Sequence, residues 1–203
     1  CNPAIGMGHV YRSMTIAHML KEHDIKFVTD TDSKIHAEKI LPNDCELFAS
    51  HEGEIIDKII SIKPDLVIND ILSTDVDDVR PLKDKGILVI NFEDLGKGAG
   101  HSDITINELF ETPVIKHQNI LWGHEYFFVR EEFDSARVRK YKDSVNSVLI
   151  TFGGIDALDC TSKAFLAIND FCIKNQIRIN IVTGPGYRKY QNLKALIRDY
   201  EHV

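Results

Sequence analysis

A glycine loop and a titratable side chain occur together near the start of the chain. Gly6 and Gly8 are followed directly by His9, and Arg12 lies about one helical turn further on. Glycines let the backbone turn tightly and approach a ligand, and the free N–H groups of a new helix attract anions. His9 adds an imidazole that exchanges a proton near neutral pH. The segment predicts an anion cradle with a candidate base; the alternative is a histidine that bonds only locally at a helix start.

Two further charged residues are candidates for the same site. Arg12 could bind a phosphate or a carboxylate through its forked guanidinium, or it could be a solvated or sheet-capping side chain. Asp70 directly follows a predicted strand, where site residues collect, and could bond a sugar hydroxyl. Its alternative is a helix-capping or loop carboxylate.

A second group of polar residues follows the next predicted strand. Glu93 and Asp94 lead into a glycine-rich loop and are candidate acid, base or hydroxyl-binding groups; the alternative is a solvated loop pair. Asn107 is a candidate for the wall of a ligand cleft, and an Asx-turn is its alternative.

A second glycine loop lies in the last third of the chain. Gly153 and Gly154 separate a predicted strand from a predicted helix, a geometry that lets backbone approach a phosphate. The alternative is a tight strand-to-helix turn. Asp156 is a candidate nucleotide-binding residue, but capping a helix that begins at Ala157 is the simpler expectation.

Apolar runs of strand length alternate with amphipathic stretches, and this order must position those residues. The predicted strands are Ile25–Thr29, Cys45–Ala49, Asp65–Asn69, Gly86–Asn91, Ser147–Phe152 and Ile177–Thr183. The predicted helices are His9–Lys21, Ser33–Ile40, Glu52–Ile62, Asp75–Lys85, Ala157–Lys174 and Lys189–Tyr200. Near-continuous Ile and Val runs between helices indicate parallel strands buried on both faces. The expected class is α/β with doubly wound parallel sheets.

Two Rossmann-like domains are expected. Residues 1–133 form the first, with a less regular stretch over 93–130, and residues 134–203 begin the second. A phosphate-type loop normally follows the first strand of such a sheet, so a strand upstream of Cys1 is expected. The second domain is expected to be incomplete here. Facing domains of this kind form a cleft with one glycine loop on each wall.

Composition excludes several function classes. The net charge is −7 and the pI about 5.7, which argues against a nucleic-acid partner because such binding needs a basic face. The four cysteines lack C-x-x-C spacing, and this favours reduced thiols in a cytoplasmic protein. No His/Cys cluster has zinc spacing, and no apolar run reaches the roughly 20 residues of a membrane span. We expect neither a metal nor a cofactor.

Taken in order, these motifs resemble a known family. They are Gly6-x-Gly8-His9-x-x-Arg12, Asn69-Asp70, Asn91-Phe92-Glu93-Asp94, Asp103 with Asn107, and Thr151-Phe152-Gly153-Gly154-x-Asp156. The chain resembles the spore-coat polysaccharide biosynthesis group, which is related to the UDP-sugar hydrolase of pseudaminic acid synthesis and to the MurG-like GT-B superfamily. The resemblance implies two Rossmann domains with a nucleotide sugar between them. The stretch Asp70-Ile71-Leu72-Ser73 lacks the tyrosine that the hydrolase carries there.

The resemblance implies a nucleotide-sugar-processing enzyme of surface polysaccharide synthesis. It would cleave the sugar–phosphate bond of a UDP-linked amino sugar with water, and His9 would act on that water. Two alternatives stay open: a GT-B glycosyltransferase, and a non-catalytic sugar-nucleotide-binding module fused to or partnered with a cytidylyltransferase.

Overall fold

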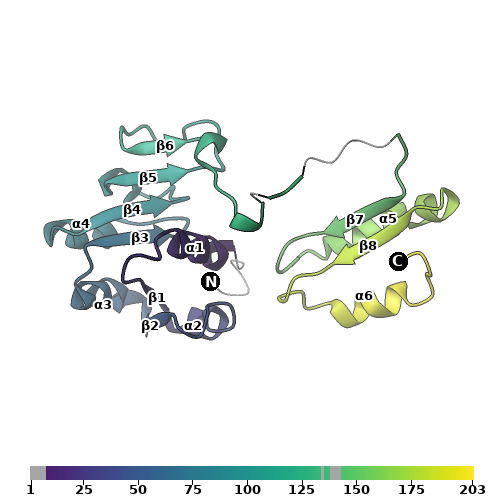
Figure 1. Ribbon diagram of the computed structural model, residues 1–203, viewed down its shortest axis with the longest axis horizontal. Helices are drawn as coiled ribbons and strands as arrows, with labels where there is room; N and C mark the ends of the chain where they lie inside the picture. Colours follow the sequence, from purple (N-terminus) through teal and green to yellow (C-terminus); the bar gives the residue numbers. More distant parts are fainter. Residues whose placement is uncertain (1–7, 134, 138–142) are drawn as a thin grey trace. The chain divides into compact units, whose positions relative to one another are not determined.

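The computed structural model describes residues 8–133, 135–137 and 143–203, which form two compact units (Figure 1). Unit 1 contains Gly8–Ser135 and unit 2 contains Ala136–Val203. Each unit is an α/β structure with parallel strands and its own apolar core. The two-domain GT-B arrangement stays a prediction.

The described part of unit 1 contains six parallel strands in two sheets. The strands are β1 (Lys26–Asp30), β2 (Glu46–Ser50), β3 (Leu66–Asp70), β4 (Leu88–Phe92), β5 (Ile104–Asn107) and β6 (Ile120–Trp122). β1 pairs with β2, and the other four strands pair in chain order. Asp70 is opposite Phe92, and Phe92 is opposite Ile106, so the ends of β3, β4 and β5 are in register.

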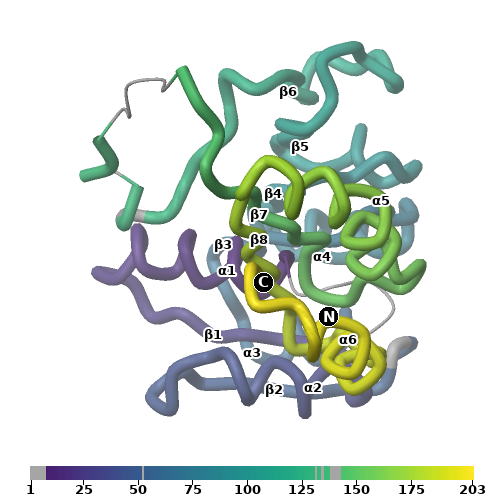
Figure 2. The backbone as a smooth tube through the Cα atoms, turned by 90° about the vertical axis from the view of Figure 1, so that its right-hand side faces the viewer, coloured from purple at the N-terminus to yellow at the C-terminus, as the bar shows by residue number. Residues whose placement is uncertain are grey.

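The two sheets of unit 1 follow the layout of one interrupted doubly wound sheet. Figures 1 and 2 both place β1 and β2 beyond β3, on the side away from β4. No ladder joins β1 to β3 among the described residues.

The α-helices described in unit 1 are α1 (Gly8–Met19), α2 (Thr31–Ala37), α3 (Ile55–Ile62) and α4 (Val76–Asp84). α3 and α4 pack against each other over a core of Ile59, Val67, Val79, Leu82 and Val89. α1 places Val10 in a smaller cluster with residues of α2 and contacts β3. α1 therefore starts beside the strand that ends in Asp70.

Unit 2 is a parallel pair with two α-helices in its described residues. β7 (Ser147–Thr151) pairs with β8 (Arg178–Val182), and α5 (Cys160–Lys174) and α6 (Tyr190–Ile197) follow them. The core contains Ile150, Phe165, Cys172, Ile177 and Ile179.

One expectation about local structure is wrong, and one stretch contains elements that were not predicted. The less regular stretch 93–130 contains β5 and β6; these strands have only four and three residues, too few for a pattern to show. The helix expected from Ala157 begins at Cys160. Asp156 and Asp159 have φ values of 44° and 56°, so the chain turns through left-handed backbone before the helix can start.

Candidate functional site

Three acidic residues lie at the carboxyl ends of three neighbouring strands. Asp70 ends β3, Glu93 follows β4 and Glu108 follows β5. Because these strands are parallel and adjacent, their ends meet at one edge of the sheet, where open α/β sheets bind ligands. One side chain from α1, Arg12, reaches all three.

Arg12 binds two of these carboxylates directly. Its Nε and Nη2 each donate to one oxygen of Asp70 at 2.8 Å, and its Nη1 donates to Glu108 Oε1 at 2.6 Å. Nη1 is 3.8 Å from Glu93 Oε1, and the guanidinium carbon lies 5.8 Å from the ring centroid of Phe92. Burial alone would lower the pKa of Arg12, but Asp70 and Glu108 outweigh it and raise that pKa. Arg12 is therefore a clamp on carboxylates rather than a free phosphate ligand.

His9 is bonded to the same aspartate. Its Nδ1 lies 2.6 Å from Asp70 Oδ1. An ionised carboxylate paired with Arg12 only accepts hydrogen bonds, so Nδ1 is assigned a proton, and in the neutral imidazole Nε2 then keeps its lone pair. The His9 side chain is 19% exposed and Asp70 only 3%. The arrangement is a histidine whose orientation is fixed by a buried carboxylate.

Glu108 was not expected from the sequence as a site residue. Only 2% of its side chain is exposed, and its Oε2 has no hydrogen-bond partner among the described residues. Burial raises the pKa of Glu108; Arg12 opposes this, while Glu93 and Asp70 add to it. The only signal was weak, since Glu108 follows the alternating segment Ile104-Thr105-Ile106-Asn107, and β5 was too short to be predicted.

Glu93 is held in a strained conformation beside the clamp. Its φ is 56°, in the left-handed region that a non-glycine residue rarely adopts. The backbone N–H of Glu93 donates to Ile106 O at 2.9 Å, and its Oε1 accepts from Leu109 N at 3.3 Å. These bonds keep the buried carboxylate at the strand edge, in the position expected for a site residue.

Asp94 forms a buried hydrogen-bond centre instead of facing a ligand. Its Oδ1 accepts from the N–H groups of Thr74 and Gly96 at 2.9 and 2.8 Å. Its Oδ2 accepts from the hydroxyl of Thr74 and, at 2.7 Å, from the amide of Asn91. All four lone-pair positions are used, so the geometry gives no support to Asp94 as a substrate-binding group. Gly96 is needed beside this centre, because a Cβ there would lie 2.2 Å from Thr74 O.

Asn107 is fully buried and uses only part of its amide. Its Nδ2 donates to Asp94 O at 3.0 Å, and its Oδ1 has no partner within the described part of the chain. The side chain is thus tied to the Asp94 centre, and the expected position in a cleft wall stays a prediction.

The first glycine loop is described only in part. Gly8 begins α1, with open space where a Cβ would be, while Gly6 lies outside the described residues. The start of α1 lies near a group of carboxylates that outnumber their one guanidinium. The expected anion cradle therefore has an unfavourable electrostatic setting.

In unit 2, the glycine loops after β7 and β8 pack backbone against backbone. A Cβ on Gly184 would lie 2.3 Å from Gly154 Cα, and Gly186 N donates to Gly154 O at 2.9 Å. Gly153 has a φ of 70°, which suits glycine. The close backbone contacts and the positive φ explain why glycine stands at these positions. Phosphate binding by Gly153 and Gly154 stays a prediction.

Asp156 already occupies the start of α5. Its two oxygens accept from the N–H groups of Cys160 and Thr161 at 2.7 and 2.8 Å. Burial would raise the pKa of Asp156, but these bonds outweigh it and lower that pKa. A helix start that holds a carboxylate is a poor place for a nucleotide phosphate, so the capping role fits better than nucleotide binding.

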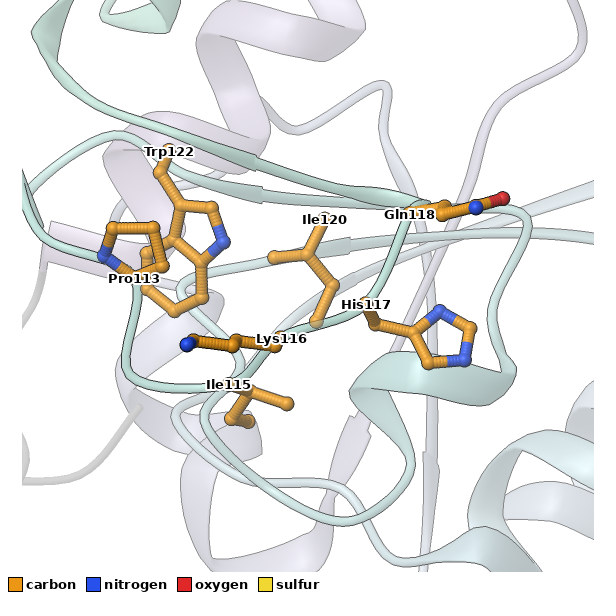
Figure 3. A pocket seen from close by; sticks show the side chains of 7 residues that line it. All are labelled: Pro113, Ile115, Lys116, His117, Gln118, Ile120 and Trp122. Atoms are coloured by element: carbon orange, nitrogen blue, oxygen red, sulfur yellow. The ribbon is translucent and has the colours of Figure 1, made fainter.

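An open hollow of about 370 Å³ lies elsewhere in unit 1, around β6. Its lining includes Pro113, Ile115, His117 and Trp122, and Figure 3 shows Trp122 and His117 at opposite ends. None of its lining residues belongs to the Arg12 cluster, which consists of Arg12, the three carboxylates around it and His9.

Metal and membrane features can be judged only over the described residues. Within them, no group of three or more His, Cys, Asp or Glu residues is placed to hold a metal ion. No helix in the described part of the chain combines the length and apolar character that crossing a membrane requires.

Fold and site define an α/β protein with parallel sheets and a carboxylate-clamped histidine at a sheet edge. No family model matches the chain. It is similar to an uncharacterized protein of Methanocaldococcus jannaschii, with 28% identity over an alignment of 214 positions that covers 97% of this chain. The chain spans 43% of the length of that relative.

Proposed function

We propose that the protein processes a nucleotide sugar, with His9 as the base that activates water against the sugar–phosphate bond of a UDP-linked amino sugar. The observation that carries the proposal is the 2.6 Å bond between His9 and Asp70 at the strand edge. It frees Nε2 for a water molecule and stabilises the imidazolium that forms when the proton is taken. The motif resemblance supports the choice of a UDP-sugar and a role in surface polysaccharide synthesis.

The proposed hydrolysis forms one bond at the anomeric carbon and breaks another. The water oxygen attacks the anomeric carbon while His9 Nε2 accepts one of its protons. The bond from the anomeric carbon to the phosphate oxygen breaks, and UDP leaves with the electron pair. Asp70 keeps the ring in place through Nδ1, and Arg12 keeps Asp70 in place through two parallel hydrogen bonds.

The experiment is to incubate the full-length protein that contains this chain with UDP-linked amino sugars and to measure released UDP. We expect release with water alone, and loss of most turnover in His9→Ala, since a positioned base typically contributes about 10²–10⁴-fold. His51→Ala is the matched control, because His51 is an exposed histidine that directly follows β2 and takes no part in the Arg12 cluster. Unchanged turnover in His9→Ala would overturn the assignment of His9.

Release that requires an added sugar acceptor would instead favour a glycosyltransferase with the same base. Binding of UDP-sugars without any turnover in the full-length protein would favour a non-catalytic binding module.

A further inference from the structure

Glu108 has one oxygen that the protein uses and one that it does not. Oε1 accepts from Arg12 Nη1 at 2.6 Å, while Oε2 is buried and lacks a partner among the described residues. Leaving a buried charged acceptor unpaired costs more than a typical hydrogen bond contributes. Among the described residues no donor fills this position, and a ligand group with an N–H or O–H would fit it.

The charges around this oxygen specify what kind of donor fits. Glu108, Glu93 and Asp70 face the guanidinium of Arg12, and His9 is bonded to Asp70. Asp70 takes two of the Arg12 donors and Glu108 a third. With all three carboxylates ionised, the negative charge exceeds the positive charge even when His9 is protonated. An anion such as phosphate is repelled by this setting, whereas an uncharged hydroxyl or an ammonium group is attracted.

We infer that Glu108 is a specificity-determining residue whose free oxygen accepts a hydrogen bond from a hydroxyl or ammonium group of the ligand's sugar. The inference rests on the proposed function for the identity of that ligand and deepens it. It assigns the sugar, not the diphosphate, to the edge formed by β3, β4 and β5.

The substitution Glu108→Gln reverses the hydrogen-bonding sense at this one atom. The glutamine oxygen still accepts from Arg12, and the amide nitrogen then places donors where the ligand needs an acceptor. Glu38→Gln is the matched control, because Glu38 follows α2, is 54% exposed and pairs with Lys34 at 3.6 Å, away from Arg12.

The test is a titration by NMR of the protein labelled in its histidine and arginine side chains. D-glucosamine, N-acetylglucosamine and inorganic phosphate, each at millimolar concentration, are the probes. We expect the sugars to move the His9 and Arg12 resonances and phosphate to leave them in place. Glu108→Gln should weaken the sugar response by about tenfold or more, as expected for a lost hydrogen bond to a charged group, and Glu38→Gln should not.

Three results would overturn the inference: a phosphate response as strong as the sugar response, no sugar response at all, or equal sugar binding in Glu108→Gln. If Glu108→Gln does not fold, as judged by its amide spectrum, the comparison of sugar with phosphate on the unchanged protein still decides. The readout needs no turnover, so a protein that binds sugar but releases no UDP would contradict the proposed function and leave this inference standing.

Discussion

Arg12 is the residue on which the chemistry of the site depends. It is 15% exposed and holds Asp70 with two hydrogen bonds, and Asp70 in turn orients His9. A lysine could supply the charge but not the two parallel bonds. The position of the proposed base therefore depends on a guanidinium that never needs to touch the ligand.

Replacing Arg12 should lower the free energy of unfolding, because the carboxylates that it pairs with then lack a cation. Arg12→Met keeps much of the side-chain volume but leaves Asp70, Glu93 and Glu108 without their cation. Breaking a buried ion pair by removing one partner costs about 3–5 kcal/mol, so we expect a loss of that order in the free energy of unfolding. Urea unfolding at neutral pH measures it.

The loss in Arg12→Met should shrink at acid pH, because the stranded carboxyl groups then bind protons and lose their charge. Lys34→Met, which removes an exposed lysine, is the control and should change the free energy of unfolding by less than about 1 kcal/mol. An equally small change in the free energy of unfolding in both variants would contradict the role of Arg12 in stabilising these carboxylates.

At the scale of elements, the strand edge is aligned by bonds that cross from one element to the next. Asp103 precedes β5 and joins three of them: it is paired with Lys83 of α4, it accepts from Val89 N of β4 at 2.7 Å, and its own N–H donates to Val89 O at 2.9 Å. This fixes where β5 begins, and Asn107 and Glu108 lie only a few residues further on. The Asp94 centre serves the same purpose at the end of β4.

The substitution Asp103→Asn should lower stability in a pH-dependent way. The Lys83 ammonium and the Val89 N–H hold the pKa of Asp103 below its ordinary value, although burial opposes them. Because the carboxyl pKa is lower in the folded state, the unfolded state binds more protons at pH values between the folded and the unfolded pKa. The stabilisation is therefore complete above the unfolded pKa and is lost as the pH falls through the folded one.

We expect Asp103→Asn to cost about 1 kcal/mol at neutral pH, a modest value because a third of the side chain is exposed, and less in strong acid. Urea midpoints across the acid range measure this, with Asp44→Asn at an exposed loop position as the control. A loss that stays constant down to strong acid would show that the charge of Asp103 contributes nothing.

At the scale of the whole molecule, sequence patterns predicted the alternation of strands and helices but not every element. The Ile and Val runs of β3 and β4 were sufficient, because strands buried on both faces carry a continuous apolar signal. β5 and β6 carried too little signal, and Glu108 was missed with them. His9 and Asp70 were candidates from local context and from the resemblance, yet their bond joins residues 61 positions apart, a pairing that no local pattern encodes. The role of Asp94 differs from the expected one for a related reason: hydrogen bonds that depend on the folded backbone occupy its oxygens, whereas Asp156 bonds the start of α5 as the simpler expectation had it.

The two units have separate cores, and the single tryptophan of the chain allows one of them to be followed alone. Trp122 ends β6 in unit 1 and stacks edge-on against Phe110, with ring centroids 6.3 Å apart.

Leu82 and Phe165 are both fully buried, one in each core. Leu82→Ala should cost about 2–5 kcal/mol and Phe165→Ala about 3–5 kcal/mol, each through the cavity it leaves. Because the cores share no residue, the Trp122 fluorescence midpoint in urea should fall clearly in Leu82→Ala and stay close to that of the unchanged protein in Phe165→Ala. Far-ultraviolet circular dichroism, which reports both units, should shift in both variants. An equal fall of the Trp122 midpoint in Phe165→Ala would mean that the units unfold as one cooperative body, and the site residues of unit 1 would then depend on the core of unit 2 for their stability.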